Sequence, residues 1–66
     1  MPRSGWTALH YAAGYGFFEL VALLIEKGAD LNARDDAGKT PLQVAIEMKQ
    51  DKVVELLGQM SATQNH

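Results

Sequence analysis

Apolar residues are densest between residues 17 and 25, where they cover most of the circumference of a helix. A helix with such a broad apolar surface needs neighbours on more than one side. A second apolar stripe, between residues 53 and 60, is narrower and alternates with polar positions. The two patterns predict one long helix from about Phe17 to Lys27 and another, with one face in water, that starts near an N-cap at Asp51.

Two shorter helices are predicted by their start signals. Thr7 and Thr40 are suitable N-caps, because a threonine hydroxyl can accept a hydrogen bond from a free amide of the first turn. Pro41 follows the second threonine at the first helical position, where its missing N–H has no cost. Short helices are therefore expected over residues 8–14 and 41–48.

Glycines and polar stretches mark the ends of these helices. Gly14 and Gly16 are expected to interrupt the first short helix, and Gly28 suits a left-handed C-terminal cap of the first long helix. The segment 28–38 is rich in Gly, Asp and Asn, which favours an extended connector with a turn. The polar residues 61–66 are expected to form a disordered tail.

The chain repeats itself with an offset of 33 residues. Seven positions are identical and an eighth is conservative, and all of them are glycine, threonine or apolar residues: Gly5/Gly38, Thr7/Thr40, Leu9/Leu42, Ala12/Ala45, Val21/Val54, Leu23/Leu56, Leu24/Leu57 and Leu20/Val53. A period of this length predicts stacked copies of one supersecondary unit.

The length of 66 residues allows one small domain, and such a domain buries only about 60% of the surface of its unfolded chain. The chain has no cysteine and two histidines, which excludes a disulfide framework and a cysteine-based zinc site. Stability must therefore come from helix packing, from another chain, or from a longer array of repeats.

Charge and hydropathy exclude several classes of partner. Six basic and eight acidic residues give a net charge of −2 with no basic cluster, so neither nucleic acid nor an anionic membrane surface is expected as a partner. The longest apolar stretch is far shorter than the roughly 20 residues that a membrane-spanning helix needs. No secretion signal is recognisable, and an intracellular, cytoplasmic location is expected.

Candidate catalytic and metal-binding residues are few. His10 has no second histidine or cysteine near it, so a hydrogen bond to the Thr7 turn is expected rather than a metal. Asp35 and Asp36 lack the spacing and the closing glutamate of a calcium loop, and Asp35 is expected to stabilise a turn. No nucleophile has a suitable base, so a small hydrolase has no support, and no catalytic, metal or cofactor-binding residue is assigned.

Several separated segments together resemble an ankyrin repeat. The first copy comprises residues 5–13 (Gly-Trp-Thr-Ala-Leu-His-Tyr-Ala-Ala), Gly16, residues 19–24 and residues 27–33 (Lys-Gly-Ala-Asp-Leu-Asn-Ala). The start of a second copy is found in residues 35–42 (Asp-Asp-Ala-Gly-Lys-Thr-Pro-Leu) and Ala45. The resemblance implies an all-α solenoid of two helix-turn-helix units joined by a β-hairpin finger. It implies a first repeat over 1–34, after a short lead of 1–4, and a second over 35–60.

The second copy departs from the family pattern. Gln43 replaces the histidine of the first copy, Lys49 replaces the glycine of the helix turn, and Gly58 weakens the last helix. These changes, with the polar outer face of that helix, resemble a C-terminal capping repeat. No polar capping repeat precedes the first copy, so Tyr11 and Phe18 are expected to be uncovered and to mediate self-association.

The resemblance also implies a non-catalytic role in binding another protein, through the finger tips and the concave surface of the first helices. Carried over by position, that surface contains Arg3, Trp6, Tyr15, Arg34, Asp36, Lys39, Glu47 and Met48. Trp6 and Tyr15 are the expected anchors, because large aromatic side chains are common interface hot spots.

Two alternatives stay open at this point. In the first alternative, Trp6 folds back on the N-terminal residues and Tyr15 only shields the helix turn, so that neither residue is an anchor for a partner. In the other alternative the chain is a truncated or engineered repeat fragment, which forms homo-oligomers through its first repeat and has no external ligand.

Overall fold

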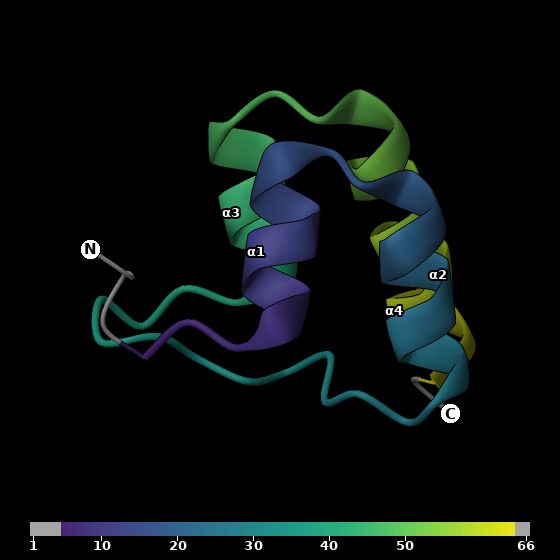
Figure 1. Cartoon of the computed structure of the whole chain (residues 1–66), viewed down its shortest axis with the longest axis horizontal. Coiled ribbons are helices and arrows are strands. Elements are labelled where there is room, and N and C mark those ends of the chain that lie inside the picture. Colours follow the sequence, from purple (N-terminus) through teal and green to yellow (C-terminus); the bar gives the residue numbers. More distant parts are fainter. Residues whose placement is uncertain (1–4, 65–66) are drawn as a thin grey trace.

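The computed structural model describes the backbone of residues 5–64 and the side chains of residues 5–60. Within this part of the chain it contains four helices and no strand: α1 (Ala8–Tyr15), α2 (Phe18–Glu26), α3 (Pro41–Glu47) and α4 (Asp51–Gln64). α1 packs beside α3 and α2 beside α4, so the first helix pair lies against the second (Figure 1). The all-α prediction is confirmed for the described residues.

Both short helices begin with the same pair of reciprocal hydrogen bonds. The Thr7 hydroxyl accepts from the His10 amide at 3.3 Å, and His10 Nδ1 accepts from the Thr7 amide at 3.1 Å. In the second unit Thr40 and Gln43 repeat the arrangement at 3.3 and 3.0 Å. This is a capping box, and it confirms both threonines as N-caps.

Helices α1, α2 and α3 end in the same way, with a left-handed residue one position after α1 and two positions after α2 and α3. The left-handed residues are Gly16 (φ 77°), Gly28 (φ 89°) and Lys49 (φ 59°). In each case the next amide bonds back across the last turn, for example from Phe17 to the carbonyl of Ala12 at 2.9 Å. This is a Schellman motif, so the cap expected at Gly28 is confirmed.

The connector between α2 and α3 contains turns but no strand in the described residues, so the expected β-hairpin is not found there. We call residues 28–40 the finger. At the tip its two arms are joined by two backbone hydrogen bonds, from the Asp35 amide to the Lys39 carbonyl at 3.0 Å and from the Gly38 amide to the Asp35 carbonyl at 2.9 Å. The Lys39 amide does not return to a backbone carbonyl but bonds to the Asp35 carboxylate at 2.8 Å, and a strand ladder cannot start from that pair.

The last helix differs from the sequence prediction at both ends. α4 begins at Asp51 itself, which therefore lies in the first turn and not at the N-cap. The helix continues to Gln64, so the expected disordered tail is wrong over residues 61–64, while residues 65–66 lie outside the described part. Residues 61–64 contain neither Gly nor Pro, and extending an existing helix needs only one residue fixed per new hydrogen bond.

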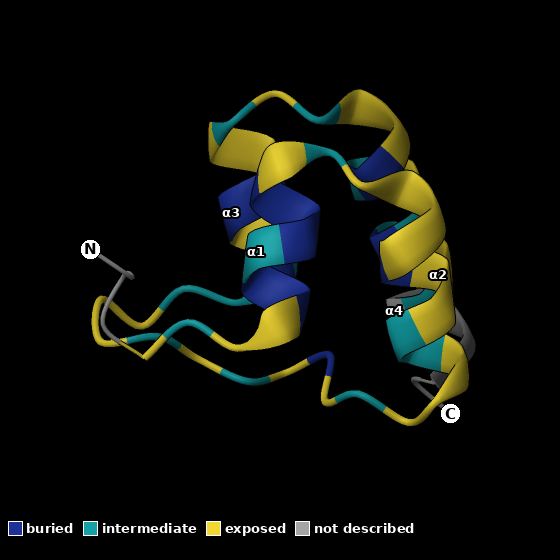
Figure 2. Ribbon diagram, in the orientation of Figure 1, coloured by how far each residue is buried: buried dark blue, intermediate teal, exposed yellow. Residues whose placement is uncertain are grey.

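The core lies between the two helix pairs. Its fully buried residues come from all four helices and from the finger: Leu9, Ala12, Ala13, Val21, Leu31, Ala45, Val53 and Leu57. α2 contributes only Val21 to this set, and much of its length is exposed (Figure 2). α2 contacts both α1 and α4, so the expected neighbours on more than one side are present, although much of its surface stays exposed among the described residues. No helix of the described residues is long and apolar enough to span a bilayer.

Candidate protein-interaction surface

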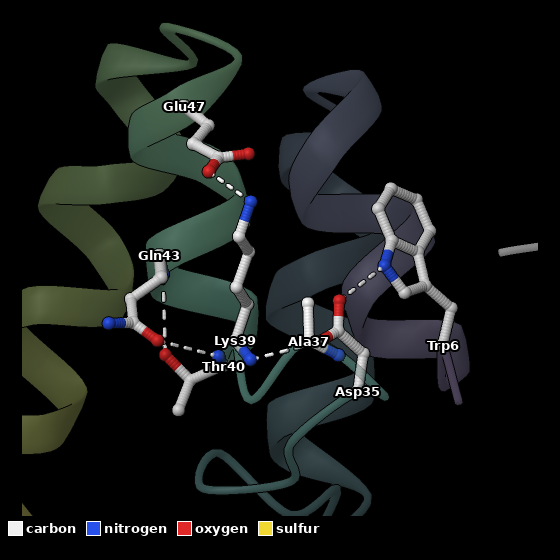
Figure 3. A network of polar contacts seen from close by, with 7 residues as sticks. All are labelled: Trp6, Asp35, Ala37, Lys39, Thr40, Gln43 and Glu47. Carbon is white, nitrogen blue, oxygen red and sulfur yellow. Dashed lines mark hydrogen bonds and ion pairs between the residues drawn. The ribbon is translucent and has the colours of Figure 1, made fainter. Parts of the chain in front are cut away.

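Trp6 precedes α1 and is bonded to the finger. Its indole N–H donates to Asp35 Oδ2 at 2.9 Å (Figure 3). Its ring contacts the Tyr11 ring edge-on, with centroids 4.8 Å apart. The side chain is half-buried. Trp6 therefore joins the first unit to the finger, a role that sequence reasoning did not identify.

Asp35 holds the tip of the finger through both carboxylate oxygens. Oδ1 accepts from the amides of Ala37 at 2.9 Å and Lys39 at 2.8 Å, while Oδ2 accepts from Trp6. The Lys39 amide is the main cause that keeps the pKa of the Asp35 carboxyl below its ordinary value; Trp6 and Ala37 act the same way, and partial desolvation opposes them. The expected turn-stabilising role of Asp35 is confirmed.

His10 is fully buried and connects three segments of the chain. Its Nε2 lies 2.7 Å from the Lys39 carbonyl, which can only accept, so Nε2 carries the proton and Nδ1 accepts from Thr7. The same Lys39 oxygen also accepts from the Asp35 amide. The predicted bond to the Thr7 turn is confirmed, and the bond to the finger adds a link between the units.

Gly14 lies where side chains of α3 approach the backbone of α1 closely. A Cβ atom added there would lie 3.0 Å from Val44 Cγ1, 3.2 Å from Met48 Sδ and 3.3 Å from Trp6 Cη2. Gly14 therefore lies inside α1, where its missing side chain lets the helices meet, and it does not interrupt the helix as expected. Tyr15 adjoins this point, with its ring centroid 6.4 Å from that of Trp6.

A charged pair borders these aromatic and sulfur-containing side chains. The Lys39 ammonium forms an ion pair with the Glu47 carboxylate along α3, and both side chains are exposed (Figure 3). Such a pair adds little to stability because water competes for both charges. Trp6, Tyr15, Lys39, Glu47 and Met48 thus gather along α1, α3 and the finger, and we call these five residues the inner surface.

The other expected contact residues lie at the finger or outside the described chain. Arg34 and Asp36 are exposed on the finger. Asp36 approaches Gly5 so closely that an added Cβ at that glycine would lie 2.7 Å from Asp36 Oδ1. Arg3 falls outside the described residues, so the structure says nothing about it.

The two residues expected to mediate self-association do not share a surface. Tyr11 is half-buried between the rings of Trp6 and Tyr15. Phe18 lines a shallow groove between α2 and α4 together with Lys52, Glu55, Leu56 and Gln59. Phe18 therefore belongs to the side of α2 that faces the second unit.

Sequence reasoning missed two further features. Gln50 donates from Nε2 to the Gly14 carbonyl at 3.0 Å and so caps the end of α1 from the second unit; nothing in the sequence pattern indicates this bond. Leu20, Leu23 and Ile46 are 41%, 47% and 54% exposed. The exposure of Leu20 and Leu23 agrees with the expectation that the apolar side of the first unit is uncovered, whereas the exposure of Ile46 was not foreseen. The described residues contain no cluster of three potential metal ligands.

Comparison with known proteins agrees with this architecture. The family model described as ankyrin repeats (3 copies) matches residues 2–66. The chain is similar to human rabankyrin-5 (46% identity over 83% of this chain), to mouse protein phosphatase 1 regulatory subunit 12A (42% over 83%) and to bovine ankyrin repeat and SOCS box protein 3 (49% over 65%). It spans only 5%, 5% and 8% of the lengths of these relatives.

Proposed function

Because the chain belongs to the ankyrin-repeat family, whose repeats generally mediate protein–protein interaction, we propose that it is a non-catalytic binding module for another protein. The partner contacts the inner surface and the tip of the finger. One observation supports this assignment above the others: Trp6, Tyr15 and Met48 gather around Gly14 on the α1–α3 pair, beside the exposed Lys39–Glu47 pair.

The composition of the inner surface fits a protein partner. Tyr15 is 55% exposed, so its ring is available to a partner, and Met48 is half-buried beside it. An aromatic and flexible apolar centre with charged groups at its rim is the common layout of protein interfaces. Trp6 has a second role in holding Asp35, so its removal would disturb the finger as well as the surface.

The experiment therefore uses Tyr15→Ala/Met48→Ala and leaves Trp6 intact. The double variant, a control variant and the wild-type chain are each immobilised and exposed to an extract of the cells that express the protein. The retained proteins are identified by mass spectrometry. We expect a protein retained by the wild-type chain to be at least tenfold depleted on the double variant. The matched control is Lys52→Ala/Gln59→Ala in the groove between α2 and α4, outside the inner surface, which should retain it. Equal retention by wild type and Tyr15→Ala/Met48→Ala would overturn the assignment.

A second candidate function is self-association of the chain without an external ligand, as expected of a repeat fragment. It is supported by the exposure of Phe17, Leu20 and Leu23 at 55%, 41% and 47% on the first unit. An apolar surface of this kind gains free energy when another surface covers it. Light scattering across a concentration series measures the association directly.

A further inference from the structure

The 33-residue offset shows which surface of a unit its preceding neighbour covers. In the second unit, Val44 and Met48 approach Gly14 of the first unit, and Gln50 bonds to its carbonyl. Val53 is buried to 1% exposure and Leu56 packs against the core. Val44, Met48, Gln50, Val53 and Leu56 thus mark the covered surface of the second unit.

The same positions of the first unit form a surface that no second helix pair covers in the described chain, and only Tyr11 among them is partly covered, by Trp6. They are Tyr11, Tyr15, Phe17, Leu20 and Leu23, and we call them the N-terminal face. Leu20 is 41% exposed where Val53 is 1% exposed, and half-buried Tyr11 stands where Val44 is 2% exposed. In Figure 2 the two helices of the first unit lie in front of the second pair, and α2 is exposed along most of its length.

The N-terminal face consists of aromatic and aliphatic residues, and its three aromatic side chains form a continuous row. Its rings contact one another, with centroids 6.2 Å apart for Tyr11 and Tyr15 and 6.1 Å apart for Tyr15 and Phe17. An aromatic side chain presents about 150–250 Å² in all, so Tyr15 and Phe17, both 55% exposed, offer on the order of 200 Å² between them. Leu20 and Leu23 enlarge this area toward the roughly 800 Å² per partner of a standard interface.

The opposite end of the molecule cannot serve as the partner of this face. The positions that correspond to His10, Ala13, Gly14 and Val21 are Gln43, Ile46, Glu47 and Val54, and we call these four the C-terminal face. Between the units, even a single added Cβ at Gly14 would approach Val44 Cγ1 to 3.0 Å. In head-to-tail stacking a glutamate would occupy that position and a tyrosine would replace Val44, so the helices could not approach.

We propose that the N-terminal face binds the N-terminal face of a second copy around a two-fold axis. The proposal rests on the proposed self-association and specifies its geometry. A two-fold contact uses the same patch on both partners and is closed at the dimer, whereas head-to-tail contacts would continue into longer oligomers. Head-to-tail stacking is blocked because Ile46 and Glu47 on the C-terminal face are bulky. Of these two arrangements, only the two-fold pairing of N-terminal faces buries the exposed aromatic rings.

The first test is sedimentation of the whole chain from low to high micromolar concentration. We expect a monomer–dimer equilibrium without larger species. Leu20→Lys places a charge in the N-terminal face and should weaken the dimer at least tenfold, while the matched variant Ile46→Lys on the C-terminal face should leave it unchanged. Both positions are about half exposed, so both variants should keep the wild-type circular dichroism. Weakening by Ile46→Lys and not by Leu20→Lys would overturn the proposal.

The second test uses the absence of cysteine from the sequence. Leu23→Cys should cross-link to itself with a short bis-maleimide, and a mixture of Leu23→Cys with Ile46→Cys should give no mixed product. A mixed cross-link, or oligomers beyond the dimer, would overturn the two-fold geometry while self-association stands. A monomer at every concentration would overturn both the geometry and self-association.

Discussion

The starts of α1 and α3 have the same local geometry but differ in what they connect. Each has a threonine cap closed by the side chain three residues later, His10 in α1 and Gln43 in α3. The Gln43 side chain is exposed and ends at its own turn, whereas His10 is fully buried and extends to the Lys39 carbonyl of the finger. A capping residue can therefore be purely local, or it can join two units when its second polar atom meets a neighbour.

The largest effect is expected from removing the residue that joins the units. His10→Ala leaves the Lys39 carbonyl and the Thr7 amide without their imidazole partner and opens a buried space. We expect a loss of roughly 2–3 kcal/mol in the free energy of unfolding. Gln43→Ala removes only an exposed cap bond and should cost less than about 1 kcal/mol.

Urea denaturation followed by circular dichroism measures both values. If the two alanine variants lose equal stability, the buried imidazole adds nothing beyond its local cap, and the distinction between the two helix starts is wrong.

A smaller effect is expected at the turn after each first helix. Gly16 and Lys49 are equivalent by the offset and both are left-handed, but a residue with a side chain is strained in this conformation. Lys49→Gly should therefore stabilise the chain by up to about 1 kcal/mol. Gly16→Ala should destabilise it by about 1–2 kcal/mol, since its Cβ would also collide with Gln50 Oε1.

Thermal unfolding is the suitable measurement here, because about 1 kcal/mol shifts the Tm of a domain of this size by roughly 4–8 °C. Lys52→Gly, in α4, serves as the control that a glycine inside a helix destabilises. A lower Tm for Lys49→Gly would show that the lysine side chain contributes more than the strain removes.

The smallest effect is expected in the pH dependence of the stability of the chain, through Asp35 in the finger that joins the two units. The pKa of Asp35 is held below its ordinary value in the folded chain, mainly by the Lys39 amide. Its ionised form thus favours the folded state above about pH 4, and this contribution is lost as the pH falls below about 4 through the lowered pKa.

Asp35→Asn removes this titration, so its Tm should fall less than the wild-type Tm between about pH 5 and pH 2.5. Asp36→Asn, beside it on the exposed finger, is the matched control and should follow the wild-type profile more closely. Parallel curves for the wild type and Asp35→Asn would contradict the assignment of the Asp35 hydrogen bonds.

The sequence predicted most of the local structure. The threonine caps, the left-handed residue at Gly28 and the turn at Asp35 followed from residues that lie within a few positions of one another. One error concerned a single residue but had a long-range cause. Gly14 was expected to interrupt α1, and this was wrong because its role is a contact with α3, a segment about 30 residues away.

The candidate surface was only partly predictable. Trp6, Tyr15 and Met48 were assigned to one surface, and the structure brings them together. The groove that contains Phe18 was not foreseen, because it exists only where α2 lies beside α4.

The sequence by itself determined the repeat of 33 residues and the start of each short helix, because these depend on residue type and short-range hydrogen bonds. Tertiary structure decided which of two equivalent residues is buried. Val21 is fully buried and the identical Val54 only half-buried, since one lies between the units and the other at an end. Burial depends on the neighbours that surround a side chain, and the type of a residue does not determine which segments pack around it.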